Sequence, residues 1–185
     1  MLPRNTALVV IDVQKAFDNP AWGTRNNPEA ERNIARLLEA WRAAGRPIFH
    51  VKHDSADPAS TLRAGTVGNE IKEEAKPRTN EPVITKNVNS AFIGTDLEKR
   101  LRDRGITALV LVGLTTDHCV STTARMAGNL GFDCYVVGDA TATFSRRSPF
   151  GKLFDAQVMH ETSLASLHEE FAKVVDTSSL LRMLA

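Results

Sequence analysis

The chain has little that would support a disulfide framework, a membrane span or a secretory signal. It contains two cysteines in 185 residues, and in a reducing compartment we expect both thiols to be free. No apolar run approaches the roughly 20 residues that cross a bilayer. The first residues, MLPRNTALVVID, form a short apolar stretch that runs into an acidic residue and lacks a cleavage site. We therefore predict a cytoplasmic protein without a membrane partner.

An excess of charge of one sign is also lacking. Lys and Arg number 23 against 22 Asp and Glu, which leaves a formal net charge of +1. Because proteins that bind nucleic acid usually present a basic surface, we expect no nucleic-acid partner. A glycine-rich phosphate-binding turn is missing as well. After the first apolar run the chain reads Asp12-Val13-Gln14 instead of Gly-x-Gly-x-x-Gly, which disfavours a nucleotide-binding Rossmann protein.

The chain does contain a regular alternation of short apolar runs with amphipathic segments. Its length fits one core, and no linker or repeat divides it, so we predict a single domain over residues 1–185. The apolar runs span 7–11, 47–51, 82–85, 108–112, 134–137 and 172–175, and the helical patterns span 28–44, 95–104, 120–130, 153–160 and 178–184. Strands that are apolar on both faces are typical of parallel sheets covered by helices. The alternation predicts a three-layer α/β/α, doubly wound, mainly parallel six-stranded sheet of Rossmann-like type.

Two charged residues stand where apolar runs end. Ligands of such sheets bind beyond the carboxyl ends of the strands. Asp12 follows the first run, where desolvation favours a protonated carboxyl unless a cation lies near; the alternative is a helix cap or a structural ion pair. Lys86 closes the third run, and a buried lysine needs an anion such as Asp12. The alternative is a surface lysine whose stem covers apolar area.

The two cysteines have different surroundings. Cys119 ends the polar turn 115–119 after the fourth run, at or near the start of a helix. There the helix dipole and free backbone N–H groups would stabilise a thiolate and could hold an oxyanion. Cys134 lies within an apolar run and is expected to be a small core residue. A thiolate, a lysine and a carboxylate converging at three strand ends would form a nucleophilic site.

Three segments also carry a family resemblance. Asp12-Val13-Gln14 with Phe17 is similar to a D-x-Q-x-x-F segment, residues 86–92 to a K-x-x-x-S-A-F segment, and residues 113–120 to a nucleophile turn. Together they resemble the isochorismatase-like cysteine hydrolases, which include nicotinamidases, N-carbamoylsarcosine amidohydrolases, ureidoacrylate amidohydrolases and isochorismatases. The resemblance covers nearly the whole chain in order and spacing.

The resemblance implies catalytic roles for three residues. Cys119 would attack a carbonyl carbon, Asp12 would carry the thiol proton to the leaving amine, and Lys86 would hold both groups. Backbone N–H groups of Thr115 and Cys119 would form an oxyanion hole, with a cis peptide bond between Leu114 and Thr115. This favours hydrolysis of an amide or carbamoyl C–N bond of a small molecule. Hydrolysis of a vinyl ether, or a non-catalytic small-molecule binding protein, are the alternatives. The family also implies a homo-oligomer, dimeric or tetrameric.

A substrate pocket is expected around the predicted catalytic residues. Its predicted lining is Gln14, Phe17, Trp22, His53, Phe92, Thr116 and Phe144. For each aromatic residue a core position is an equal alternative. The tandem Arg146-Arg147 could bind a substrate carboxylate, although tandem charges more often face water.

The usual metal motif of nicotinamidases is altered in this chain. Those enzymes place Asp-x-His just after the second strand, where this chain has His53 in place of the Asp and Ser55 in place of the His. We therefore predict no metal site and no cofactor. His50 and His53 should point to opposite faces of the strand, which disfavours a metal held by both.

Overall fold

Six parallel strands form the centre of the computed structural model, which describes residues 1–184. Their order in the sheet is β3-β2-β1-β4-β5-β8. The strands are β1 (Ala7–Ile11), β2 (Ile48–His53), β3 (Val83–Lys86), β4 (Ala108–Leu114), β5 (Asp133–Ala142) and β8 (Lys173–Val175). Every neighbouring pair in this sheet is parallel. The predicted six-stranded doubly wound sheet is confirmed.

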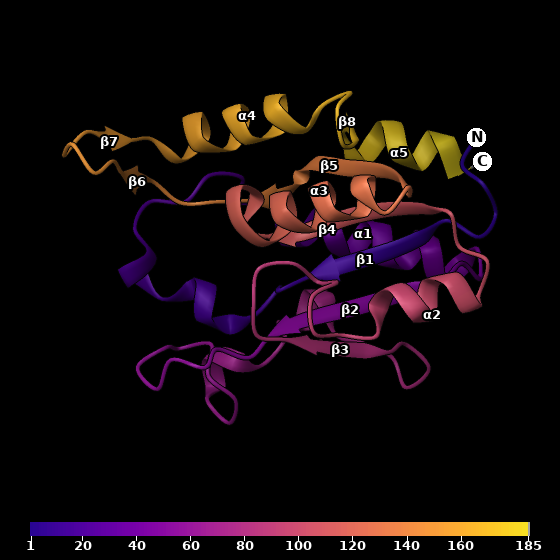
Figure 1. Cartoon of the computed structure of the whole chain (residues 1–185), viewed down its shortest axis with the longest axis horizontal. Helices are drawn as coiled ribbons and strands as arrows, with labels where there is room; N and C mark the ends of the chain where they lie inside the picture. The colour runs from indigo at the N-terminus through magenta and orange to yellow at the C-terminus, as the bar shows by residue number, and fades with distance from the viewer. Residues whose placement is uncertain (185) are drawn as a thin grey trace.

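Five α-helices cover the two faces of the sheet. They are α1 (Ala30–Ala43), α2 (Leu97–Asp103), α3 (Ser121–Asn129), α4 (Ala156–Leu167) and α5 (Thr177–Leu184). Side chains of α1 and α5 pack in one apolar cluster, and those of α2, α3 and α4 pack in the cluster on the other face (Figure 1). Within the described part of the chain, no helix is both long enough and apolar enough to cross a membrane.

The alternation of side chains along β1 builds both clusters. Leu8 and Val10 face the cluster of α1, whereas Val9 and Ile11 face the opposite one. Because both faces of β1 are covered, its sequence is apolar throughout, as expected of a central parallel strand. The buried face of α1 ends at Trp41, whose Nε1 donates a hydrogen bond to Thr6 O at 3.1 Å.

The winding of the sheet reverses between β1 and β4, which lie side by side. Such a reversal is where doubly wound sheets bind ligands, beyond the carboxyl ends of the strands. In Figure 1 those ends point away from the two chain termini. The close approach of β4 to β1 requires a glycine: Gly113 has φ +124°, and a Cβ there would lie 1.9 Å from Ile11 O.

Four predicted helix starts, at 28, 95, 120 and 153, precede the observed starts at Ala30, Leu97, Ser121 and Ala156. The pattern over 153–160 begins as a helix only at Ala156, because Leu153–Phe154 (β7) pairs with Arg146–Arg147 (β6) in an antiparallel ribbon. Asp155 then caps the helix by accepting from Gln157 N–H at 2.8 Å. The pattern over 120–130 becomes α-helical at Ser121, after a π-helical turn over Thr116–Val120. Cys119 therefore lies inside this turn.

Short 3₁₀ turns shape the loops around the carboxyl ends of the strands. They are Lys15–Asp18, Pro20–Trp22, Val67–Asn69 and Glu73–Ala75. The first two follow β1, and the other two lie in the long connection from β2 to β3.

Candidate active site

Four neighbouring strands bring four polar side chains to one point. Asp12 follows β1, His53 and Lys86 are register partners at the ends of β2 and β3, and Cys119 lies in the turn after β4. Lys86 Nζ lies 2.6 Å from Asp12 Oδ2, 3.1 Å from His53 Nδ1 and 3.3 Å from Cys119 Sγ. The three residues predicted to be catalytic are thus in contact, with His53 as a fourth member of the group.

The backbone at Asp12 is left-handed. Its φ is +49°, a region that costs a non-glycine residue of order 1–3 kcal/mol. Neighbouring hydrogen bonds hold it there: Asp12 N–H donates to Val51 O at 2.9 Å, and Asp12 O accepts from Gln14 N–H at 2.8 Å. Oδ1 of Asp12 is buried and has no hydrogen-bond partner within residues 1–184. The carboxylate therefore keeps a free acceptor close to Cys119.

Burial dominates the electrostatics of this group. It raises the pKa of Asp12, against the opposing effect of the Lys86 cation. Burial, followed by the charge of Asp12, raises the pKa of the Cys119 thiol to about 12, although Lys86 opposes this. Burial and the neighbouring carboxylate thus favour the thiol over the predicted resting thiolate, and Lys86 opposes them. Asp12 is the base that lies nearest to remove the thiol proton.

The group does not fit a metal ion. Asp12, His53 and Cys119 offer ligand atoms within 4.8 Å of one another. Each of those residues, however, contacts Lys86 Nζ, and an ammonium at their centre repels a second cation. His50 does not join them, since its Nε2 lies 2.8 Å from Glu81 Oε2 and Glu81 pairs with Arg42.

A cavity of about 170 Å³ opens beside the sulfur of Cys119. Its lining residues are Asp12, Phe17, Trp22, His53, Leu62, Asn89, Thr115, His118 and Cys119. Phe17, Trp22 and His53 lie where the sequence predicted a pocket, and the predicted oxyanion residues Thr115 and Cys119 line the same space. The peptide bond between Leu114 and Thr115 is cis.

Three lining residues were not predicted. Asn89 follows β3 closely and His118 immediately precedes Cys119, so the rule that ligands bind at strand ends could have found both. Leu62 comes from the long loop between β2 and β3, and nothing in its sequence surroundings indicates a pocket.

Four residues predicted to line the pocket lie behind its walls. Phe92 stacks on Phe132 in the core, with ring centroids 6.0 Å apart. Thr116 is fully buried, and its Oγ1 lies 2.9 Å from His160 Nδ1 of α4. The remaining two, Gln14 and Phe144, support residues that do line the pocket.

Gln14 fixes the main chain of His53. Its Nε2 donates to His53 O at 3.0 Å, and its Oε1 accepts from His53 N–H at 2.8 Å. Gln14 Nε2 also donates to Asn69 O at 3.0 Å. Because Gln14 is fully buried, these hydrogen bonds satisfy its amide inside the protein.

Phe17, Trp22 and Phe144 form one side of the site, here called the aromatic wall. The rings of Phe17 and Trp22 lie 5.0 Å apart, and Phe144 packs behind both, at 6.1 and 5.7 Å between centroids. Such packing explains why Phe144 is 2% exposed and does not line the cavity. The aromatic wall is therefore two layers deep, with the front layer in contact with the cavity.

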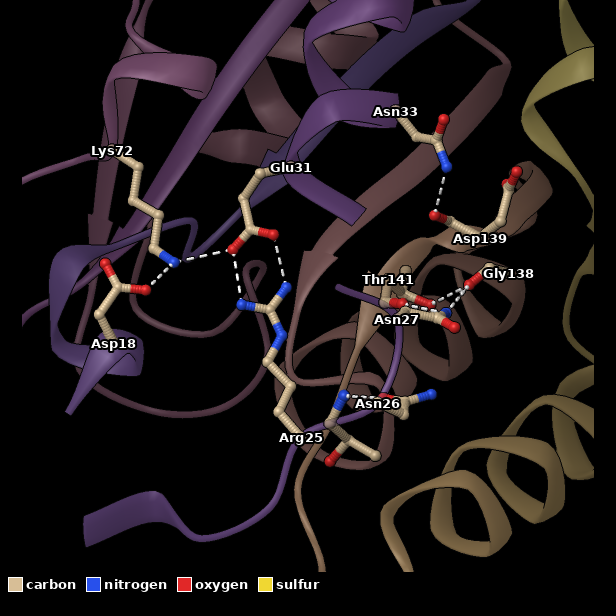
Figure 2. Close-up of polar contacts among 11 residues, drawn as sticks. Asp18, Arg25, Asn26, Asn27, Glu31, Asn33, Lys72, Gly138, Asp139 and Thr141 are labelled. Atoms are coloured by element: carbon tan, nitrogen blue, oxygen red, sulfur yellow. Dashed lines mark hydrogen bonds and ion pairs between the residues drawn. The ribbon is translucent and has the colours of Figure 1, made fainter. Parts of the chain in front are cut away.

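Ion pairs and amides anchor the segment that carries the front of this wall (Figure 2). Lys72 Nζ contacts Asp18 and lies 2.8 Å from Glu31 Oε1. Arg25 forms a two-pronged pair with the same Glu31 carboxylate. Asn27 Nδ2 donates to Gly138 O and Thr141 O of β5, at 3.0 and 2.8 Å. In Figure 2 the ion pairs around Glu31 form one group and the contacts of Asn27 with Gly138 and Thr141 form another.

The tandem arginines of β6 are engaged elsewhere. Arg146 Nε lies 2.9 Å from Asp117 Oδ2, and Asp117 also accepts a hydrogen bond from Thr143. Arg147 donates to Gly151 O at 2.6 Å within the ribbon. Neither arginine lines the cavity, so the structure does not place a cation there for a substrate carboxylate.

Comparison with known proteins assigns the chain and its fold to one family. The family model described as the isochorismatase domain matches residues 6–179. The chain is 50% identical to the isochorismatase family protein YrdC of Bacillus subtilis, over 95% of this chain and 94% of that one. It is 30% identical to Nicotinamidase 3 of Arabidopsis thaliana, over 96% and 88%.

A solved structure agrees with these sequence relatives. A hydrolase of the isochorismatase family from Chromobacterium violaceum has a TM-score of 0.96 and 44% identity, covering 100% of this chain and 95% of that one. The chain therefore belongs to the isochorismatase family of hydrolases.

Proposed function

We propose that this protein hydrolyses an amide or carbamoyl C–N bond of a small molecule, with Cys119 as the nucleophile. The observation that carries the proposal is the contact of Lys86 Nζ with both Asp12 Oδ2 and Cys119 Sγ, at 2.6 and 3.3 Å, beside a small cavity. The name of one relative, Nicotinamidase 3, is that of an amidase and supports acyl chemistry.

In the first half of the proposed reaction Asp12 removes the thiol proton as Sγ attacks the carbonyl carbon. The C=O π electrons move to oxygen, and the backbone N–H groups of Thr115 and Cys119 bind that oxyanion. When the C=O bond re-forms, the C–N bond breaks and Asp12 passes its proton to the leaving nitrogen. A thioester on Cys119 remains.

In the second half a water molecule attacks the thioester. Asp12 takes a proton from this water, the C–S bond breaks, and the proton returns to Sγ as the acid leaves. The pKa of Asp12 is raised by burial, which makes it a stronger base toward the thiol. Lys86 remains beside the negative charge throughout, since Asp12 and Cys119 both contact its ammonium.

The test compares Asp12→Asn with Cys119→Ala on a panel of small amides and N-carbamoyl compounds. Ammonia or amine release measures turnover, and mass spectrometry after iodoacetamide treatment measures the reactivity of Cys119. Turnover of Asp12→Asn should fall by about 10²–10⁴-fold, the usual contribution of a general acid–base. Its alkylation should be as fast as in the wild type or faster, because the charge of Asp12 raises the pKa of the thiol.

Controls separate this mechanism from its alternatives. Cys119→Ala should lose both turnover and labelling, whereas Cys134→Ala, which removes a thiol packed in the core, should keep both. Near-normal turnover of Asp12→Asn would remove Asp12 from the mechanism. The alternative is an isochorismatase reaction. It would replace the amidase proposal if the wild type hydrolysed a vinyl ether but no amide, and if Cys119→Ala kept that activity.

A further inference from the structure

His53 is held from three directions. Gln14 bonds its backbone N–H and its backbone oxygen, at 2.8 and 3.0 Å. Lys86 Nζ lies 3.1 Å from its Nδ1. The ring itself lines the cavity beside Cys119. A side chain fixed in this way presents its remaining ring atoms in one orientation, which is what a binding group in a site requires.

Contact with Lys86 determines the tautomer of His53. An ammonium has three donors and no acceptor, so the ring nitrogen that it contacts must accept through a lone pair. The ring proton is then on Nε2. Burial, followed by the charge of Lys86, lowers the pKa of His53, which keeps the ring neutral at neutral pH.

The Nε2–H group is left without a protein partner. No residue within 1–184 accepts a hydrogen bond from His53 Nε2, and this atom is not among the buried unpaired atoms, so it stays accessible. A fixed donor at the wall of a binding cavity, with no acceptor of its own, is available to a ligand.

We propose that His53 is a specificity-determining residue that donates a hydrogen bond from Nε2 to a second acceptor atom of the substrate, apart from the scissile carbonyl. This inference rests on the proposed function. The acceptor is a neutral one, a carbonyl oxygen or a ring nitrogen, because no side chain of the described cavity lining is Lys or Arg. Phe17, Trp22 and Leu62 offer an apolar surface for the body of the substrate. The substrate class is a flat, uncharged amide or carbamoyl compound that carries such an acceptor.

Two substitutions separate the donor from the contact with Lys86. His53→Asn places an amide oxygen near Nδ1, where it can still accept from Lys86, but it has no donor at the position of Nε2. His53→Gln extends an amide NH₂ toward the position of Nε2. Asn therefore tests the loss of the donor, and Gln tests its partial restoration. His168→Asn, at a histidine outside the cavity lining, is the matched control.

The probes are benzaldehyde and the three pyridinecarbaldehyde isomers, which differ by one ring acceptor. Each adds reversibly to the thiol: Sγ bonds to the aldehyde carbon, the C=O π bond opens, and the thiol proton ends on oxygen. Protection of Cys119 from iodoacetamide, followed by mass spectrometry, gives a dissociation constant for each probe. For each protein, the dissociation constant of benzaldehyde is divided by that of the pyridinecarbaldehyde isomer that binds most tightly. Because the same two aldehydes are compared in every protein, the difference in their intrinsic electrophilicity cancels when the ratios are compared.

We expect this ratio to fall about tenfold in His53→Asn, the effect of losing one hydrogen bond, and to recover in His53→Gln. Benzaldehyde binding is the reference within each protein and should weaken less in His53→Asn than binding of the tightest pyridine isomer, whereas His168→Asn should match the wild type throughout. An unchanged ratio in His53→Asn overturns the inference and leaves the proposed function intact. Equal weakening of all four probes also overturns it, since His53 would then act only through Lys86. If no aldehyde protects wild-type Cys119, the proposed nucleophile fails and this inference fails with it.

Discussion

At the residue scale, we expect the protonation of Asp12 to limit activity at acid pH. The proposed reaction needs Asp12 as a carboxylate, and burial raises its pKa above the ordinary value of an aspartate. A raised pKa means that the carboxylate is lost earlier as the pH falls. In a plot of kcat/KM against pH, the acidic fall should therefore occur at a pH closer to neutrality than the pKa of a free aspartate. The residual activity of Asp12→Asn should not show this fall. A limb at the ordinary aspartate value would contradict this assignment.

The reactivity of Cys119 should also rise with pH, but over a more alkaline range than the limb set by Asp12. Because its pKa is raised to about 12, the thiolate fraction grows throughout the range from neutral to alkaline pH. The rate of alkylation by iodoacetamide should rise without a plateau up to about pH 10. Cys134, whose pKa is also raised to about 12 by burial, should stay unlabelled because it is packed in the core. A plateau near neutrality would indicate a resting thiolate instead.

Removal of metal ions should leave turnover unchanged. Lys86 Nζ contacts Asp12, His53 and Cys119, and its charge disfavours a metal ion among them. The measurement is amide hydrolysis before and after dialysis against a chelator, followed by addition of zinc or iron. Loss of turnover that either metal restores would require a metal site in this group.

At the scale of elements, the segment over 15–27 depends on a cluster of charges. Burial alone would raise the pKa of Glu31, but its hydrogen bonds to Arg25 and Lys72 outweigh this and lower the pKa to about 2. Because the pKa of Glu31 is lower in the folded protein than in the unfolded chain, the ionised carboxylate stabilises the fold at pH values above the ordinary pKa of a glutamate. This contribution is lost as the pH falls toward 2. The aromatic wall should therefore loosen when the cluster loses a member.

Lys72→Met tests this dependence. It removes the cation between Asp18 and Glu31, both of which contact Lys72 Nζ. Glu31 keeps its pair with Arg25 but loses one charge-assisted hydrogen bond. We therefore expect KM to rise more than kcat falls, and the free energy of unfolding to drop by about 1.5–3 kcal/mol, the contribution of a hydrogen bond to a charged group. Lys76→Met is the control, since its side chain is 67% exposed and pairs only with Glu73. Equal effects of the two substitutions would contradict a role for the cluster.

The ends of the strands were the features of the fold that the sequence predicted best. Asp12, Lys86 and Cys119 follow apolar runs, and parallel strands bring such positions to one edge of the sheet. Helix starts were less readable: the apolar pattern over 153–160 does not reveal that Leu153–Phe154 pairs with Arg146–Arg147. Pairing of this kind depends on residues distant in sequence, and so does the burial that raises the pKa of Cys119.

At the scale of the whole molecule, the walls of the cavity come from loops that meet only after folding. Leu62 packs in one apolar cluster with Ala16 and Phe17 of the segment after β1. Gln14 of that segment bonds to His53 at the end of β2 and to Asn69 in the connection from β2 to β3. No local pattern encodes such contacts. Of the residues predicted to line a pocket, His53 at a strand end lines the cavity, whereas Phe92 and Phe144 lie one layer behind it.

Self-association of the whole molecule stays a prediction. Phe150 is 96% exposed and Leu153 57% exposed, at the tip of the β6–β7 ribbon that projects from one end of the molecule (Figure 1). Exposed apolar side chains gathered on a projecting element often mark contact surfaces.

In sedimentation velocity at micromolar concentration, we expect the wild-type chain of 20.3 kDa to form a dimer or tetramer. Phe150→Ser should shift it toward the monomer, while Val67→Ser, at a side chain 69% exposed elsewhere, should not. A wild type that sediments only as monomer would contradict self-association, and an unaffected Phe150→Ser oligomer would place the interface on another surface.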